Sequence, residues 1–251
     1  MRLSLSDVRG IAAFDLALRV VRVRRCLGIS CRPWHAERVT SEQPPVLLDL
    51  AAYGGDWDVA IALAAQECPR GYTDVAKKHM MGRRSIGTGF LLFGSFVSRM
   101  RGLHEGVIRE LRSSNPHAVL PLIRAWVETI TIGLYLLRNP NYAEYLLNGP
   151  GDGRPGRKSF EAMFHAVRED ASQLKVVYRD LSDYSHFGSL GVWNAHSIEN
   201  EEEGLVSWTD VPRWKSDREF QIACAQANEL GRAGLDVLDR IGDLLVSMAP
   251  Q

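Results

Sequence analysis

Residues 115 to 139 read NPHAVLPLIRAWVETITIGLYLLRN. The stretch is apolar on almost every side of a helix, whereas a helix at the surface of a domain is apolar on one side only. Asn115 is expected to cap this helix, with Pro116 in its first turn. The sequence therefore predicts a helix over residues 116 to 138 that lies in the middle of a helical bundle.

The polar residues of this central helix follow one narrow line, with spacings of 4, 3, 4 and 3: Arg124, Glu128, Thr131, Tyr135 and Arg138. Buried polar groups without partners cost about 1 to 3 kcal/mol each, so the line needs partners. Two interpretations stay open for Arg124 and Glu128. They point into a polar pocket shared with Arg179 and His186, or they form a buried ion pair that holds two helices in register.

Helical periodicity and turn residues predict the neighbouring elements. Helices are expected over residues 88–112, 142–147, 159–167, 171–187 and 216–248, the last opened by a capping box of Ser216 and Glu219. Residues 190–198 and 205–211 flank an acidic turn, which predicts a small β-hairpin between the last two long helices. The expected fold is an all-α helical bundle with this one hairpin.

The first third of the chain is predicted to be an appended helical segment of unknown role, covering residues 1–87. Helices are expected over residues 4–27, 46–53 and 57–67, followed by a basic loop with Lys77, Lys78, Arg83 and Arg84. Residues 88–251 then form the bundle.

Composition indicates an ordinary globular protein, because 251 residues with 45% hydrophobic content can bury a real core. The formal charge of zero is unevenly spread. Residues 1–112 carry 17 basic and 11 acidic residues, and residues 113–251 carry 13 and 19. This asymmetry permits a local surface that binds a polyanion. It argues against a protein that binds nucleic acid over its whole surface. A merely uneven, solvated surface is the alternative.

Neither a metal nor a cofactor is expected. The four cysteines form no CxxC pair, and the histidines show no zinc-binding spacing. No secretory signal is recognised at the N-terminus, and the most apolar stretches are too short to cross a bilayer. The expectation is a cytoplasmic protein without a membrane segment.

The clearest functional signal is YRDLSDYSH, residues 178–186. Arg179 and His186 are seven positions apart, which on a helix places their side chains within about 20° of each other, two turns apart. A guanidinium suits a phosphate, and an imidazole that titrates near neutral pH suits proton transfer. Together they predict chemistry on a phosphodiester. The alternative is structural: Arg179 pairs with Asp183, and His186 stabilises a helix C-terminus.

A flexible basic loop precedes this region. Residues 151–159 read GDGRPGRKS, which has one residue too many for a phosphate-binding loop and follows a predicted helix rather than a strand. We therefore do not expect the protein to be a nucleoside triphosphatase. Arg154, Arg157 and Lys158 remain candidate RNA contacts.

The sequence around Arg179 and His186 resembles the R-x(4–6)-H motif of HEPN-domain proteins, in which a polar residue often follows the arginine, as Asp180 does here. The chain also resembles a group of uncharacterised helical bacterial proteins related to that family, in the segments 123–128 and 178–186. The resemblance covers roughly residues 88–248.

The resemblance implies a metal-independent endoribonuclease of a bacterial defence or toxin system, active as a homodimer whose two motifs share a cleft. By that analogy Arg179 holds the scissile phosphate, His186 transfers the proton, and Asp180 orients one of them. Arg124, Glu128 and Asp183 would form the supporting polar pocket. An antitoxin or a neighbouring-gene product is a possible partner. The family also includes non-catalytic members, so a helical module that binds nucleotides, RNA or another protein is the alternative.

Overall fold

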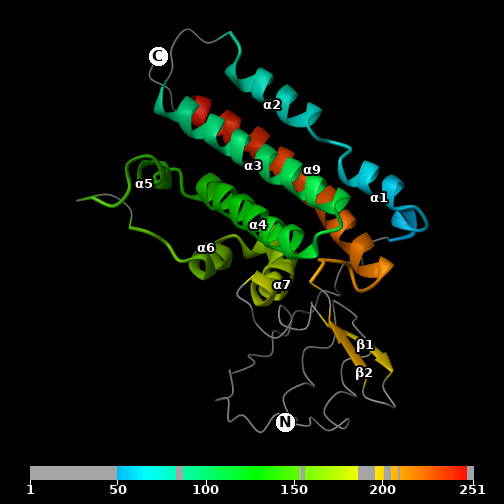
Figure 1. Ribbon diagram of the computed structural model, residues 1–251. Coiled ribbons are helices and arrows are strands. Elements are labelled where there is room, and N and C mark those ends of the chain that lie inside the picture. The colour runs from blue at the N-terminus through cyan, green and yellow to red at the C-terminus, as the bar shows by residue number, and fades with distance from the viewer. Residues whose placement is uncertain are drawn as a thin grey trace, which may run out of the picture.

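The structure is a computed structural model that describes residues 50–82, 87–151, 153, 156–185, 196–200, 205–208 and 210–247. This part is helical apart from one two-stranded antiparallel sheet, so the predicted all-α bundle is confirmed (Figure 1). Its elements are η3 (Ala51–Tyr53), α1 (Trp57–Ala64), α2 (Arg70–Met80), α3 (Thr88–Arg112), α4 (Pro116–Arg138), α5 (Tyr142–Asn148), α6 (Phe160–Ala166), α7 (Arg168–Ser185), β1 (His196–Asn200), β2 (Leu205–Trp208) and α9 (Asp217–Ser247).

Helix α4 is the centre of the bundle, as predicted. It packs against α3, α9, α6 and α7, and Figure 1 shows it between α3 and α7. Side chains on several of its sides are fully buried, among them Val119, Ile123, Trp126 and Val127. Asn115 occupies the position before the helix, but its side chain makes no capping hydrogen bond. Its Nδ2 instead donates to the Glu110 carboxylate at 3.2 Å, which ties the α3–α4 turn together.

Helices α4 and α9 approach closely at Gly133. A Cβ at this position would lie 2.7 Å from Cγ1 of Val237 and 2.9 Å from Cδ1 of Ile241. Both partners are buried in the core. Only glycine therefore allows the two backbones to come this near without displacing core side chains.

Helix α3 buries the apolar stripe that its sequence predicts. Leu92, Phe96, Met100, Val107 and Leu111 are all buried against α4 and α9. Leu103, which continues the same helical spacing, is partly buried against the same core. The spacing of these residues was thus sufficient to identify the inward face.

Residues 50–82 belong to the same hydrophobic core as the bundle, because α1 and α2 pack on α9 and α3. The basic loop expected around Lys77 and Lys78 is wrong, since both residues lie in α2. This helix buries only a narrow line, Tyr72 and His79, which are seven positions apart, and the weak apolar signal misled the prediction. The division at residue 87 stays a prediction.

Two buried histidines join α2 and α3 to their neighbours. His104 is fully buried; its Nε2 donates to the Ala64 carbonyl at 2.8 Å, and its Nδ1 lies 3.3 Å from the Tyr72 hydroxyl. Nε2 of His79 lies 2.7 Å from the Asp239 carboxylate, which also accepts from Lys78. The hydrogen bond from Lys78, followed in size of effect by the one from His79, lowers the pKa of Asp239. These contacts fix α1 and α2 on the bundle.

The hairpin lies between α7 and α9, where the sequence predicted it. Strands β1 and β2 pair antiparallel, with His196 opposite Trp208 and Ile198 opposite Val206, and the register shifts between Ile198 and Asn200. The capping box at the start of α9 is also present in part, since the Glu219 N–H donates to Ser216 Oγ at 3.2 Å.

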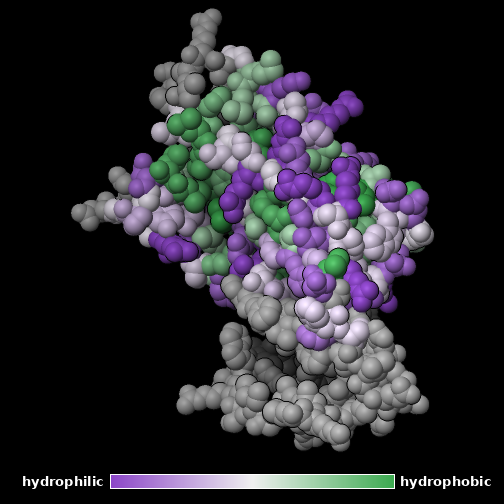
Figure 2. Space-filling view, viewed as in Figure 1, coloured by the Kyte–Doolittle hydropathy of each residue, from purple (hydrophilic) through white to green (hydrophobic). Residues whose placement is uncertain are grey.

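Helix α4 is, among the described helices, the one long and apolar enough to cross a membrane by length and composition. Of that apolar window, 67% is buried inside the bundle, as in the core helix of a soluble protein. Figure 2 shows mainly hydrophilic side chains over α1 and hydrophobic ones near the start of α3, where Leu91 is 56% exposed.

Candidate functional site

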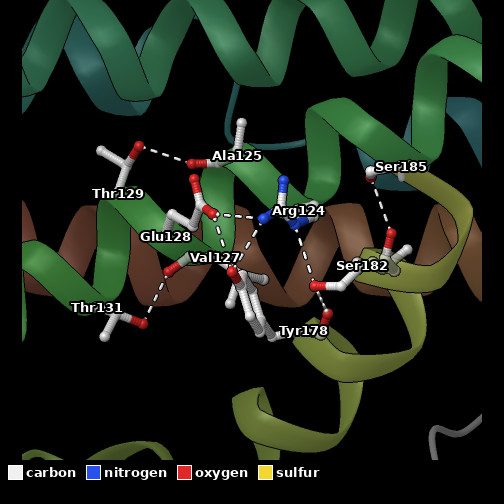
Figure 3. Close-up of polar contacts among 10 residues, drawn as sticks. Arg124, Ala125, Val127, Glu128, Thr129, Thr131, Tyr178, Ser182 and Ser185 are labelled. Atoms are coloured by element: carbon white, nitrogen blue, oxygen red, sulfur yellow. Dashed lines mark hydrogen bonds and ion pairs between the residues drawn. The ribbon is translucent and has the colours of Figure 1, made fainter. Parts of the chain in front are cut away.

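The crossing of α4 and α7 carries a compact polar cluster built around Arg124 (Figure 3). Nε of Arg124 donates to Ser182 Oγ at 3.1 Å, and Nη2 donates to the Tyr178 hydroxyl at 2.9 Å. The same Nη2 lies 3.1 Å from the Glu128 carboxylate. One guanidinium therefore joins a carboxylate on its own helix to two hydroxyls on α7.

Tyr178 completes the cluster. Its hydroxyl donates to Glu128 Oε1 at 3.2 Å, and its ring stacks on Phe160 of α6 with centroids 4.0 Å apart. Cζ of Arg124 lies 5.0 Å from the centroid of the same ring, which is within the range of a cation–π contact. Helices α4, α6 and α7 thus meet at one tyrosine. We call Arg124, Glu128, Tyr178 and Ser182 the Arg124 cluster.

The cluster is half-buried, with side-chain exposures of 20% for Arg124 and 29% for Glu128. An ion pair at this depth is screened less than one at the surface, and removing either member leaves the charge of the other without its counterion. Both charges bond to α7, so the cluster holds two helices together. Whether it also forms a pocket with Arg179 and His186 stays open.

Arg138, at the far end of the predicted polar line, has its own set of partners. Its Nη2 lies 2.9 Å from Asp170 and 3.2 Å from Glu169, and its Nη1 donates to the Ala166 carbonyl at 2.7 Å. Thr131, between the two ends, donates to the carbonyl of Val127. The prediction that this line needs partners is confirmed for Arg138, for Thr131 and for the Arg124–Glu128 pair.

Arg179 lies on α7 directly after Tyr178, and its side chain is exposed. Helix α7 turns Leu181 into the core and holds Leu174, Val177, Tyr178 and Tyr184 partly buried against it. The helical spacing of these apolar residues predicts that they share the inward face of the helix, and the structure confirms it. His186 and the side chains of Asp180 and Asp183 lie outside the described part of the structure, so the relation between Arg179 and His186 stays a prediction.

The loop before α6 carries two of the three candidate RNA contacts. Arg157 and Lys158 are exposed, and Arg154 falls outside the described residues. Burial raises the pKa of Tyr142 on α5, and a hydrogen bond to the backbone of Lys158 opposes part of that rise.

Sequence reasoning missed Tyr178 and Ser182 as members of the Arg124 cluster. Helical periodicity places Tyr178 on the inward face of its helix and Ser182 on the polar face, and the two faces meet at this point. One signal was present: Tyr178 and Ser182 are four positions apart, as are Arg124 and Glu128, so each pair presents its polar groups on one side of its helix.

Among the described residues, no group of three or more His, Cys, Asp or Glu side chains could hold a metal ion. Comparisons with protein-family models, with curated proteins and with solved structures found no match to this chain.

Proposed function

We propose that this protein is a metal-independent endoribonuclease. Arg179 binds the scissile phosphate and His186 handles the proton. The observation that supports this most is the exposure of Arg179 on a helix that its neighbours Tyr178 and Ser182 fix to α4 through the Arg124 cluster. A helix held in this way presents the guanidinium from a fixed backbone position, where it can bind a phosphate.

The chemistry needs few groups. The 2′-hydroxyl attacks the adjacent phosphorus, its proton passes to a base, and the 5′-oxygen leaves with a proton, giving a 2′,3′-cyclic phosphate and a 5′-hydroxyl. His186 supplies the proton transfer, Asp180 orients one of the two motif side chains, and Arg179 offsets charge on the phosphate oxygens. DNA lacks the 2′-hydroxyl and is not a substrate.

The proposal includes the biological setting that the resemblance implies. The protein acts in the cytoplasm in bacterial defence or as a toxin, as a homodimer whose motifs share a cleft. An antitoxin or a neighbouring-gene product restrains it. Arg157 and Lys158 contact the RNA from the loop before α6, and Arg154 belongs to the same loop.

Cleavage of RNA in the presence of EDTA tests the proposal. Wild-type protein is expected to cut single-stranded RNA, and Arg179→Ala and His186→Ala are expected to abolish the cut. Arg168→Ala and His165→Ala are the matched controls, because both residues are exposed and lie in α7 and α6. Equal cleavage by the wild type and both motif variants would show a contaminating nuclease and end the proposal.

The second candidate is a non-catalytic helical module that binds nucleotides, RNA or another protein. One observation favours it. The side chains of Arg124 and Glu128 form hydrogen bonds with Tyr178 and Ser182 inside the protein, which is a structural role rather than a catalytic one. In that case RNA survives incubation, and a nucleotide, RNA or protein ligand raises the melting temperature.

A further inference from the structure

One long side of α4 is left uncovered between α3 and α7. Figure 1 looks onto this side, and no described helix crosses in front of it. The side chains here are only half-buried, in contrast to those of α4 that face α9 and the core. We call this surface the open face of α4 and define it by Leu122, Ala125, Glu128 and Ile132.

Arg99 lies on α3 at the edge of the open face. Its Nε donates to Oγ1 of Thr129 at 3.0 Å, and Thr129 is a residue of α4 that is 2% exposed. Among the described residues no carboxylate pairs with Arg99, whereas Arg101 of the same helix pairs with Glu105. The guanidinium is therefore oriented by the protein, its charge is not offset, and its terminal nitrogens can bind a phosphate.

Small residues surround Arg99 on its helix. Ser95 and Gly102 lie four positions before it and three after it, which places them on the same side of α3. Both are exposed, and a Cβ at Gly102 would meet no atom within 4 Å. A bulky ligand can therefore approach the α3 backbone and the Arg99 guanidinium without a steric barrier.

Arg179 lies on the α7 side of the same face. Helix α7 runs antiparallel to α4, because Arg138 at the end of α4 pairs with Asp170 near the start of α7. Arg179 precedes Ser182 by three positions, and Ser182 contacts α4 through Arg124. For two right-handed helices in this arrangement, Arg179 turns to the side of the open face.

The charges on and around the open face suit a polyanion. Glu128 is the carboxylate within the face, and it is paired with Arg124 at 3.1 Å and accepts a hydrogen bond from Tyr178. Arg99 and Arg179 flank the face from opposite sides. Packed helix axes lie about 8 to 10 Å apart, so α3 and α7 are separated by at most roughly 20 Å. Two arginines that reach inward from these helices can contact phosphates of one strand.

We propose that single-stranded RNA binds across the open face of α4, with Arg99 holding a second phosphate of the strand whose scissile phosphate is bound by Arg179. The inference rests on the proposed function for the role of Arg179. The face is about one helix wide, roughly 10 Å, which fits a single strand and not a duplex. Phosphate contacts carry no sequence information, so binding here shows little preference for base sequence.

Fluorescence anisotropy of a labelled single-stranded RNA tests the face, with the full-length His186→Ala variant as the background that prevents cleavage. Adding Arg99→Ala is expected to weaken binding about tenfold and to lower the slope of log affinity against log salt concentration by about 0.7. Folding is expected to survive, because Thr129 keeps its hydrogen bond to a backbone carbonyl of α4.

Arg112→Ala in the same background is the matched control. Arg112 is an exposed arginine of the same helix, and it lies about 140° around the helix from Arg99. Its removal is expected to leave RNA affinity within about twofold of the background protein. Equal affinities of the Arg99→Ala and Arg112→Ala variants overturn the proposal.

Gly102→Glu tests the same face without removing a contact. The position has room for a side chain, so the variant is expected to fold, and Gly102→Ala controls for the added Cβ. The new carboxylate is expected to weaken RNA binding about fivefold by repelling phosphates, whereas Gly102→Ala leaves binding unchanged. RNA binding that is equally tight in the two variants contradicts the proposal.

The remaining outcomes separate this inference from the proposed nuclease. RNA cleavage by the wild type, together with RNA binding that Arg99→Ala leaves unchanged, overturns the RNA face and leaves the nuclease standing. RNA binding that depends on Arg99, without cleavage by the wild type, supports the face and contradicts the nuclease. Tighter binding of polyglutamate than of RNA assigns the face to an acidic protein and overturns the proposal.

Discussion

The hydroxyl of Tyr178 on α7 lies 2.9 Å from Nη2 of Arg124 on α4 and donates to Glu128 at 3.2 Å. One phenol therefore bonds to both members of an ion pair on another helix. The two helices cannot slide or rotate against each other without breaking these bonds. The position of Arg179, the next residue along α7, depends on this relationship.

Tyr178→Phe is expected to lower the free energy of unfolding by about 1 to 2 kcal/mol, because it removes the hydroxyl and leaves the stack on Phe160 in place. Urea denaturation measures the change. Tyr145→Phe is the control, since Tyr145 stacks on Tyr142 in α5 and lies outside the Arg124 cluster. Equal losses in the two variants would contradict a special role for the Tyr178 hydroxyl.

A double-mutant cycle on Arg124→Met and Glu128→Gln is expected to give a coupling energy of about 1 kcal/mol, because the pair is half-buried and shares Tyr178. Arg101 and Glu105 form the matched pair. They have the same spacing and order, lie 2.7 Å apart and are 44% and 48% exposed. Their coupling is expected below about 0.5 kcal/mol. Equal couplings would show that burial adds nothing at Arg124.

Gly133→Ala is expected to destabilise the protein by about 1 to 3 kcal/mol, since its Cβ would press on Val237 and Ile241. Gly102→Ala, in the middle of α3, meets no atom within 4 Å and is expected to stabilise by about 0.5 to 1 kcal/mol. Thermal unfolding of the two variants provides the comparison. Stabilisation by both substitutions would mean that α4 and α9 are less closely packed than described.

His104 predicts a pH dependence of stability. Burial lowers its pKa below the ordinary value, and the hydrogen bond to the Ala64 carbonyl opposes this only in part. The unfolded chain therefore takes up a proton at this position more readily than the folded one. Stability is unaffected above the ordinary histidine pKa and falls as the pH drops below about 6.5.

The pH effect is checked by urea denaturation between pH 7.5 and 5, comparing the wild type with His104→Gln. The variant starts less stable and is expected to lose less stability over this range. His117→Gln, an exposed position in the first turn of α4, should reproduce the wild-type slope. A slope that His104→Gln leaves unaltered would assign the effect to other groups.

The sequence predicted those helices in which the buried apolar residues recur at helical spacing. Helix α4 is apolar on nearly every side and α3 has one clean stripe, so both were identified. Helix α2 buries Tyr72 and His79 and little else, and its lysines made it resemble a loop. Polar residues can be recognised from their place on a helix, as Arg124 was, but their partners depend on which helices cross.

The same limit applies to the candidate site. The partners of Arg124 come from residues 54 and 58 positions away, and no local pattern contains that pairing. Arg179 could be chosen from sequence because its chemistry and its neighbours in the motif are local.

Truncation tests where the folded unit begins. A chain that starts at residue 50 retains every described element, and it is expected to unfold cooperatively. A chain that starts at residue 88 loses α1 and α2, which exposes buried surface on α9 and leaves His104 without Ala64 and Tyr72. It is expected to aggregate or to melt without cooperativity, because the apolar surface that α1 and α2 cover would be exposed to water. Circular dichroism on both chains decides between the boundaries. Cooperative melting of the shorter chain at the same temperature would instead support a separate segment that ends at residue 87.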